Sequence, residues 1–178
     1  MSFFITSVNP GQGGELGGLD GADAHCKKLA MAVGAGNRQW RAYLSTDAVD
    51  AKSRIGAGPW KNQKGLVVAT SVADLHSANN KLSEDNSLDE KGEYIEGNRH
   101  DILTGSNADG TKRVGFNCMN WTSSSASAKT VVGHHNRPVR EDDPNAMSWN
   151  AAHDKDGCSM EAFRGSAGDG LFYCFAAD

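Results

Sequence analysis

The sequence predicts a single α+β domain over residues 1–178, and three observations lead to this fold class. Both ends of the chain carry short apolar segments typical of strands, FFITSV near the start and LFYCFA near the end. A helical pattern follows the first of them, and 21 glycines without a collagen-like period indicate many turns. We therefore expect paired terminal strands, one long helix near the N-terminus and a loop-rich second half.

The long helix is expected between residues 20 and 33. Asp20 is suited to cap its N-terminus, and Gly34 is suited to end it. Apolar residues recur on one helical face, at Ala22, Cys26, Leu29, Ala30 and Val33. The pattern predicts that Cys26 points into the core, where a disulfide suits it better than a reactive thiolate would.

The remaining elements are expected to be short. Residues 40–45 (WRAYLS) alternate in polarity and predict a strand with one buried face, formed by Trp40, Ala42 and Leu44. Further patterns predict a short helix within residues 49–55, strands at 67–69, 94–95 and 102–103, and a tight turn at Asp109 and Gly110. Residues 171–176 form the strongest strand pattern and carry Cys174.

The four cysteines are even in number and contain no CxxC pair, which favours structural disulfides over a zinc ribbon. Their spacing alone leaves all three pairings open. Paired terminal strands would place Cys174 in the same layer as the helix, so we favour Cys26–Cys174, with Cys118–Cys158 as the remaining pair. Two bridges predict an oxidising compartment outside the cytoplasm, and the alternative is a cytosolic protein with four free thiols.

Charge and hydropathy narrow the classes of partner. The net charge is -4, and lysine and arginine are scattered, so we expect no nucleic-acid or heparin partner. No apolar run of about eighteen residues occurs, so membrane insertion is not expected. No charged-then-apolar leader precedes Phe3, and the export signal is therefore expected to be missing from this sequence.

Several segments together resemble the endostatin-like branch of the C-type lectin-like fold. They are GADAHCKKLAMAVG followed by WRAYLST, ILTGSNADGTKRVGFNCMNWTS, and the closing LFYCFA, with the cysteines in nested order. Endostatin is the C-terminal domain of certain collagens, and the resemblance implies first-to-fourth and second-to-third disulfides in a bacterial exported relative. Endostatin's arginine-rich heparin surface and its N-terminal histidine-rich zinc site have no counterpart here, so neither ligand carries over.

The expected function is a non-enzymatic binding or adhesion module whose ligand is a carbohydrate or an extracellular protein. No GxSxG elbow or activated cysteine indicates an enzyme nucleophile. The ligand surface is expected between Cys118 and Cys158, where aromatic faces and polar side chains combine. Its predicted residues are Trp121, His134, His135, Asn136, Arg137, Trp149, Asn150 and His153. The alternative is that both tryptophans belong to the core.

No cofactor is expected, but a calcium site is one alternative. Sugar-binding C-type lectins hold calcium with an EPN or QPD triplet and a downstream WND, and residues 143–145 (DPN) and 149–150 (WN) resemble fragments of both. Oxygen donors in this region are Asp142, Asp143, Asn145, Asn150, Asp154 and Asp156. The two fragments lie only four residues apart, however, so an ordinary polar loop is the favoured interpretation.

A zinc or copper site is the other alternative, and it would make the chain a metal-binding protein or a metal-dependent enzyme. The adjacent His134 and His135 face opposite sides of a strand, so only one of them is expected to join such a site. Its partners would be His153 or His100, supported by Asp101 or Asp154. No HxxxH or HExxH spacing supports the site, and ordinary hydrogen-bonded histidines are the simpler interpretation.

Overall fold

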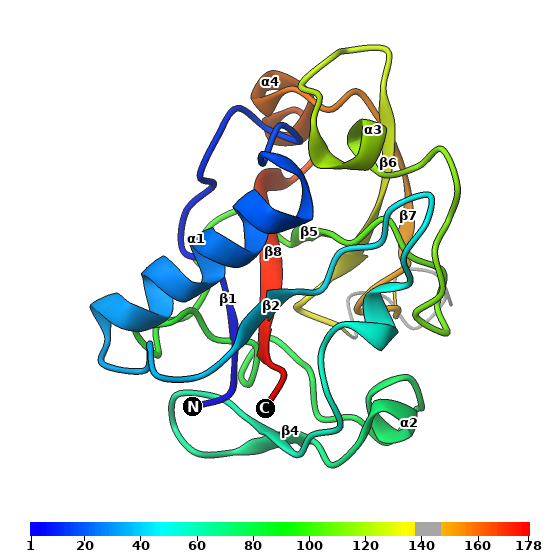
Figure 1. Cartoon of the computed structure of the whole chain (residues 1–178). Helices are drawn as coiled ribbons and strands as arrows, with labels where there is room; N and C mark the ends of the chain where they lie inside the picture. The colour runs from blue at the N-terminus through cyan, green and yellow to red at the C-terminus, as the bar shows by residue number, and fades with distance from the viewer. Residues whose placement is uncertain (138–146) are drawn as a thin grey trace.

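A mixed β-sheet organises the chain, whose computed structural model describes residues 1–137 and 147–178 (Figure 1). Its strands are β1 (Phe3–Ile5), β2 (Trp40–Ala42), β5 (Asp101–Leu103), β6 (Lys129–His134), β7 (His153–Asp156) and β8 (Gly168–Ala176). Their order is β1-β8-β5-β6-β7, and β2 also pairs with β8. A separate antiparallel pair is formed by β3 (Trp60–Lys61) and β4 (Val67–Ala69). The predicted α+β class is therefore confirmed.

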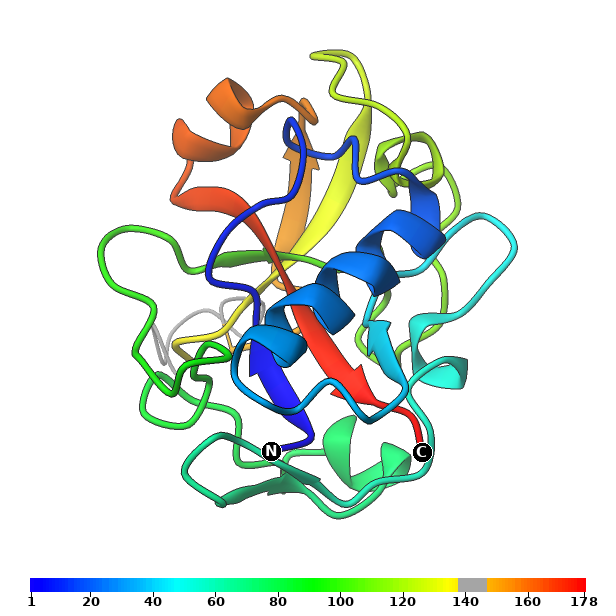
Figure 2. The ribbon, with the colours of Figure 1, turned by 60° about the vertical axis from the view of Figure 1, so that its left-hand side comes forward.

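The two terminal strands pair as predicted. Both β1 and β2 run antiparallel to β8, and Phe4 of β1 and Ala42 of β2 both lie opposite Cys174. Consequently the N- and C-termini lie side by side (Figures 1 and 2). The LFYCFA segment is buried throughout, which explains why its sequence is so uniformly apolar.

The helix α1 (Gly18–Ala32) covers one face of the sheet and crosses β8 (Figure 2). Cys26 is fully buried on its inner face and is bonded to Cys174, as predicted. The helix begins earlier than expected, because Gly17 rather than Asp20 is its N-cap. Asp20 lies instead in the first turn, where its carboxylate interacts favourably with the positive end of the helix dipole.

The opposite face of the sheet is covered as well. Tyr43, Tyr173 and Phe175 pack there in a second apolar cluster, together with side chains from β3, β4 and the short helix α2 (Val72–Leu75). The expectation of a single buried face over residues 40–45 is therefore wrong, since Tyr43 and Ser45 are also fully buried. The polar–apolar alternation of residues 40–45 does not predict an exposed face here, because both faces of the sheet are covered.

Among the shorter elements, the predicted strands at 67–69 and 102–103 and the turn at Asp109 and Gly110 are confirmed. Residues 94–95 form a loop rather than a strand, and Ile95 is apolar because it anchors that loop to the second cluster. The expected helix near 49–55 is only the 3-10 turn η1 (Ala51–Ser53). The helix α4 (Met160–Arg164) precedes β8.

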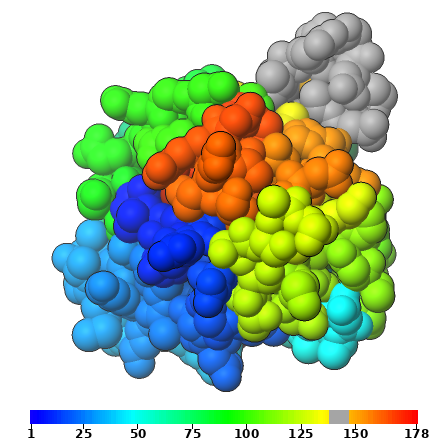
Figure 3. Space-filling model, turned by 90° about the horizontal axis from the view of Figure 1, so that it is seen from above, coloured from blue at the N-terminus to red at the C-terminus, as the bar shows by residue number. Residues whose placement is uncertain are grey.

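The second predicted disulfide, Cys118–Cys158, is also confirmed. It begins α3 (Cys118–Trp121), a left-handed turn in which φ is 50°, 55°, 59° and 65° in succession. This segment lies beside the N-terminal loop (Figure 3), where the Leu16 amide donates to the Trp121 carbonyl at 2.9 Å. All four cysteines are bonded, so the free-thiol alternative is wrong. Within the described ranges, no helix has the length and apolar character needed to cross a membrane.

Candidate functional site

Neighbouring strands bring four ionisable side chains together at one point of the sheet. Asp101 in β5 lies directly opposite His134 in β6, because these residues are partners in the antiparallel pair. His100 immediately precedes β5, and His153 is the first residue of β7, which pairs with β6. We call His100, Asp101, His134 and His153 the His–Asp cluster.

The three imidazoles of the cluster converge on one oxygen. The Nε2 atoms of His100, His134 and His153 lie 3.4, 3.2 and 3.4 Å from Asp101 Oδ1. The His134 ring contacts both other rings edge-on, at centroid distances of 4.6 and 5.2 Å. Ligand atoms of His100, Asp101 and His134 all lie within 4.8 Å of one another, so these three residues could hold one metal ion, and His153 is not part of this group.

Burial makes this convergence chemically significant. The Asp101 side chain is only 4% exposed, and its Oδ1 atom has no hydrogen bond of acceptable geometry within the described residues. A buried carboxylate oxygen left in this state costs free energy and calls for an explanation. A cation bound by this oxygen and by the Nε2 atoms of His100 and His134 would satisfy it, so these three residues fit a metal ion.

The electrostatics favour the metal-binding protonation states of Asp101 and His100, but not that of His153. Burial acts to raise the pKa of Asp101, but interactions with His134 and His153, and then with His100, outweigh it and lower the pKa to about 2. Burial lowers the pKa of His100, whereas the contact with Asp101 raises the pKa of His153. At neutral pH the cluster therefore offers an ionised carboxylate and a neutral His100 imidazole, both of which are metal ligands.

His135 lies beside the cluster but is not among its converging ligand atoms. It is almost completely buried, and its backbone amide donates to the His100 carbonyl at 3.3 Å. Burial, followed by repulsion from His100, His134 and Arg99, lowers the pKa of His135 to about 4. The side chain is therefore neutral at pH 7, and its backbone amide helps to hold His100 in place.

The two tryptophans predicted to stack on a ligand are core residues. Trp121 is fully buried and donates through Nε1 to the Ser45 carbonyl at 2.7 Å. Trp149 is 3% exposed and donates to the Leu75 carbonyl at 3.1 Å. Neither ring offers a face to an outside ligand, because each indole is enclosed and its N–H is already bonded.

Three other predicted ligand residues mainly connect loops. The Asn150 amide is buried and donates to the Tyr43 hydroxyl at 2.9 Å. Arg137 donates to the Leu82 and Met147 carbonyls at 3.1 and 3.3 Å and to the Asn80 side chain. Asn136, which precedes Arg137 in the chain, is half-buried. Of the predicted set, His134 and His153 are therefore the two that join the cluster.

The calcium alternative receives little geometric support from the residues described. Asp142, Asp143 and Asn145 lie outside the described residues. Asp154 accepts a hydrogen bond from Arg113 at 2.6 Å, and Asp156 pairs with Lys129 at 3.1 Å. These carboxylates are engaged with separate cations rather than directed at a common point.

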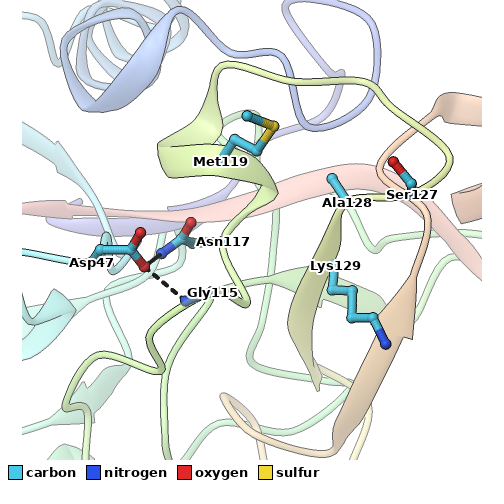
Figure 4. A pocket seen from close by; sticks show the side chains of 7 residues that line it. All are labelled: Asp47, Gly115, Asn117, Met119, Ser127, Ala128 and Lys129. Carbon is cyan, nitrogen blue, oxygen red and sulfur yellow. Dashed lines mark hydrogen bonds between the residues drawn. The ribbon is translucent and has the colours of Figure 1, made fainter.

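A surface cavity of about 380 Å³ lies beside α3 (Figure 4). Its carboxylate, Asp47, accepts hydrogen bonds from the Gly115 amide at 2.8 Å and the Asn117 side chain at 2.7 Å. The Gly115 bond and then the Asn117 bond lower the pKa of Asp47. Because Asp47 is already engaged, this cavity is a weaker candidate than the His–Asp cluster.

Neither protein-family models nor curated proteins give any match to this chain.

Proposed function

We propose that this chain is an extracytoplasmic binding module that holds one divalent transition metal ion, zinc in particular, at the His–Asp cluster. The observation that carries the proposal is the group of ligand atoms from His100, Asp101 and His134, which all lie within 4.8 Å of one another around a buried Asp101 oxygen. Zinc bonds to imidazole and carboxylate are about 2.0–2.1 Å long, so neighbouring ligands of a tetrahedral ion are separated by about 3.3–3.4 Å. The separations of the His100 and His134 Nε2 atoms from Asp101 Oδ1, 3.4 and 3.2 Å, match that spacing.

The chemistry of the donors supports zinc over the harder cations. Two imidazoles and one carboxylate suit zinc and related transition metals, whereas calcium and magnesium prefer oxygen donors alone. Neutral imidazoles and one carboxylate leave a bound dication with one net positive charge. A hydrogen-bonded salt-bridge cluster is the competing explanation, but it leaves the buried Asp101 Oδ1 without an aligned donor among the described residues.

The proposed compartment rests on the disulfides, because two such bonds persist in oxidising surroundings. The finer fold assignment, an endostatin-like member of the C-type lectin-like fold, is part of the proposal. It is supported by the nested disulfides, the paired terminal strands and the helix packed across them. We propose that the chain is an exported bacterial member of this fold.

The proposal is tested by titrating metal-free protein with zinc in competition with a chromophoric chelator. We expect one zinc ion per chain. His134→Ala and Asp101→Asn should each weaken binding by more than the roughly 10- to 100-fold typical of a lost outer contact, because each removes a direct ligand. Near-UV circular dichroism establishes that each variant is folded.

His76→Gln is the matched control, because it removes a histidine that lies outside the cluster and bonds to Tyr43 at 2.7 Å. It should bind zinc like the parent. The proposal fails if folded parent protein binds no zinc at millimolar concentration, or if His134→Ala binds it as tightly as the parent does.

A further inference from the structure

A second group of ionisable side chains lies outside the His–Asp cluster, where α1, β2 and η1 meet. Asp23 of α1 accepts hydrogen bonds through Oδ2 from Arg41 Nη1 of β2 at 2.6 Å and from Arg54 Nη2 at 2.7 Å. Arg54 directly follows η1, and its Nη1 atom also donates to the Ala42 carbonyl at 2.7 Å. The other oxygen of Asp23 accepts from the Ala42 amide at 2.8 Å. One carboxylate therefore positions both guanidinium groups, and both of its oxygens are engaged.

The charges of this group do not balance. Two guanidinium groups share one carboxylate, which leaves one surplus positive charge. The Arg54 side chain is only 10% exposed, so water screens its charge incompletely. Since an uncompensated buried charge is costly, the arrangement favours the binding of an anion.

A cavity of about 450 Å³ borders Arg41 and Arg54, near the point where β2 and the end of β8 lie side by side (Figure 1). It is lined by Arg41, Arg54, Gln39, Ser53, Gly56 and Ala177. None of these lining residues carries a carboxylate, and the neighbouring Asp178 is paired with Arg38 at 3.3 Å. A guanidinium has five N–H donors, and within the described residues Arg41 uses one of them in a hydrogen bond. The remaining donors of Arg41 are therefore available to a ligand in the cavity.

We infer that Arg41 and Arg54 form a binding site for the carboxylate group of a second molecule. The planar fork of a guanidinium matches a carboxylate, which it can bind through two parallel hydrogen bonds. One carboxylate also neutralises the one surplus charge. The cavity is larger than an isolated ion needs and has a volume typical of small-molecule sites, so we expect the carboxylate to belong to an acidic sugar or a peptide. The inference does not depend on the proposed metal ion.

A purely structural Arg–Asp–Arg group is the competing explanation, and NMR spectroscopy of metal-free protein separates the two. The reporters are the Nε–H resonances of Arg41 and Arg54 at constant ionic strength, because a bound carboxylate shifts them. The probes are glucuronate and the α-amide of N-acetylaspartate, which present one carboxylate on a sugar and on an amino acid. Glucuronamide and the α-amide of N-acetylasparagine are their neutral controls. We expect at least one carboxylate probe, and neither control, to give saturable shifts, and the tighter probe identifies the source of the carboxylate.

Variants test whether the arginines make the site. Arg41→Gln removes the surplus charge and should weaken binding of the tighter probe roughly 10- to 100-fold, which is the effect of losing a charge-assisted hydrogen bond. Arg41→Lys keeps the charge but loses the planar fork, so its affinity should lie between those of Arg41→Gln and the parent. Near-UV circular dichroism establishes that each variant is folded.

Arg164→Gln is the matched control, because Arg164 pairs with Asp169 at 2.8 Å and does not line the cavity. It should bind the probe like the parent. The inference fails if neither carboxylate gives saturable shifts at tens of millimolar, or if the neutral controls shift the resonances equally. It also fails if folded Arg41→Gln binds the probe as tightly as the parent does.

Discussion

The two disulfides should contribute unequally to stability, and their positions predict which matters more. Cys26–Cys174 spans 148 residues and Cys118–Cys158 spans 40. In the loop-entropy treatment these bridges stabilise the folded state by about 5 and about 4 kcal/mol, a difference of about 1.2 kcal/mol. All four cysteines are fully buried, so replacing either pair by alanine removes a similar amount of packing.

Backbone strain should widen the difference. The Cys118–Cys158 bridge holds a turn of four non-glycine residues in the left-handed region, which costs roughly 1–2 kcal/mol for each residue. Removing this bridge lets part of that strain relax and thereby offsets part of the lost stabilisation. The Cys26–Cys174 bridge instead joins a regular helix to a regular strand.

The double variants Cys26→Ala/Cys174→Ala and Cys118→Ala/Cys158→Ala test this order by urea unfolding of metal-free protein. We expect the first to lose at least about 1 kcal/mol more free energy of unfolding than the second. Comparing the denaturant slopes shows whether the unfolded states remain similar. If both variants lose the same free energy of unfolding, or the second loses more, loop entropy is not the dominant contribution of these disulfides to stability.

Three further predictions concern folding energetics. Burial lowers the pKa of His76 in the folded protein, so the stabilisation that comes from the neutral imidazole is complete above pH 6.5, the pKa in the unfolded chain, and is lost as pH falls. His76→Gln should therefore reduce the slope of the free energy of unfolding against pH below 6.5 by up to about 1.4 kcal/mol per pH unit. Gly133→Ala would place Cβ 1.8 Å from the Trp149 carbonyl oxygen and should destabilise strongly, whereas Gly165→Ala, with its nearest contact at 3.3 Å, should be mild, as thermal unfolding would show. Asp23→Ala removes a buried carboxylate bonded to two arginines at 2.6 and 2.7 Å and should cost about 3–5 kcal/mol in urea unfolding; a loss below 1 kcal/mol would contradict this.

Much of the fold can be predicted from local patterns. The periodicity around Cys26 indicates both the helix and its buried face, and the LFYCFA segment indicates a buried strand. The failures have a common cause. Tyr43 and Ile95 are buried by segments distant in the sequence, and no local pattern reveals that the sheet is covered on both faces.

The site is harder to predict because its residues meet through strand pairing. His134 and His153 are in the predicted ligand set, whereas His100 enters only as a possible metal ligand and Asp101 only as a supporting carboxylate. The register that places Asp101 opposite His134 depends on the pairing of β5 with β6, which residue spacing does not specify. The polar, turn-rich setting of Trp149 likewise suggests a surface role for a residue that the fold encloses.

The proposed metal ion would cross-link elements that the disulfides do not join. Cys26–Cys174 joins α1 to β8, and Cys118–Cys158 joins α3 to the segment that follows β7. A bound ion would link β5 to β6 through side chains, in addition to the backbone hydrogen bonds that pair these strands. At a free metal concentration 1,000 times the Kd, it would stabilise the fold by about 4 kcal/mol, close to the contribution of a disulfide. Because Asp101 and His134 lie opposite each other in the β5–β6 pair, the ion would reinforce the strand pairing that forms its own site.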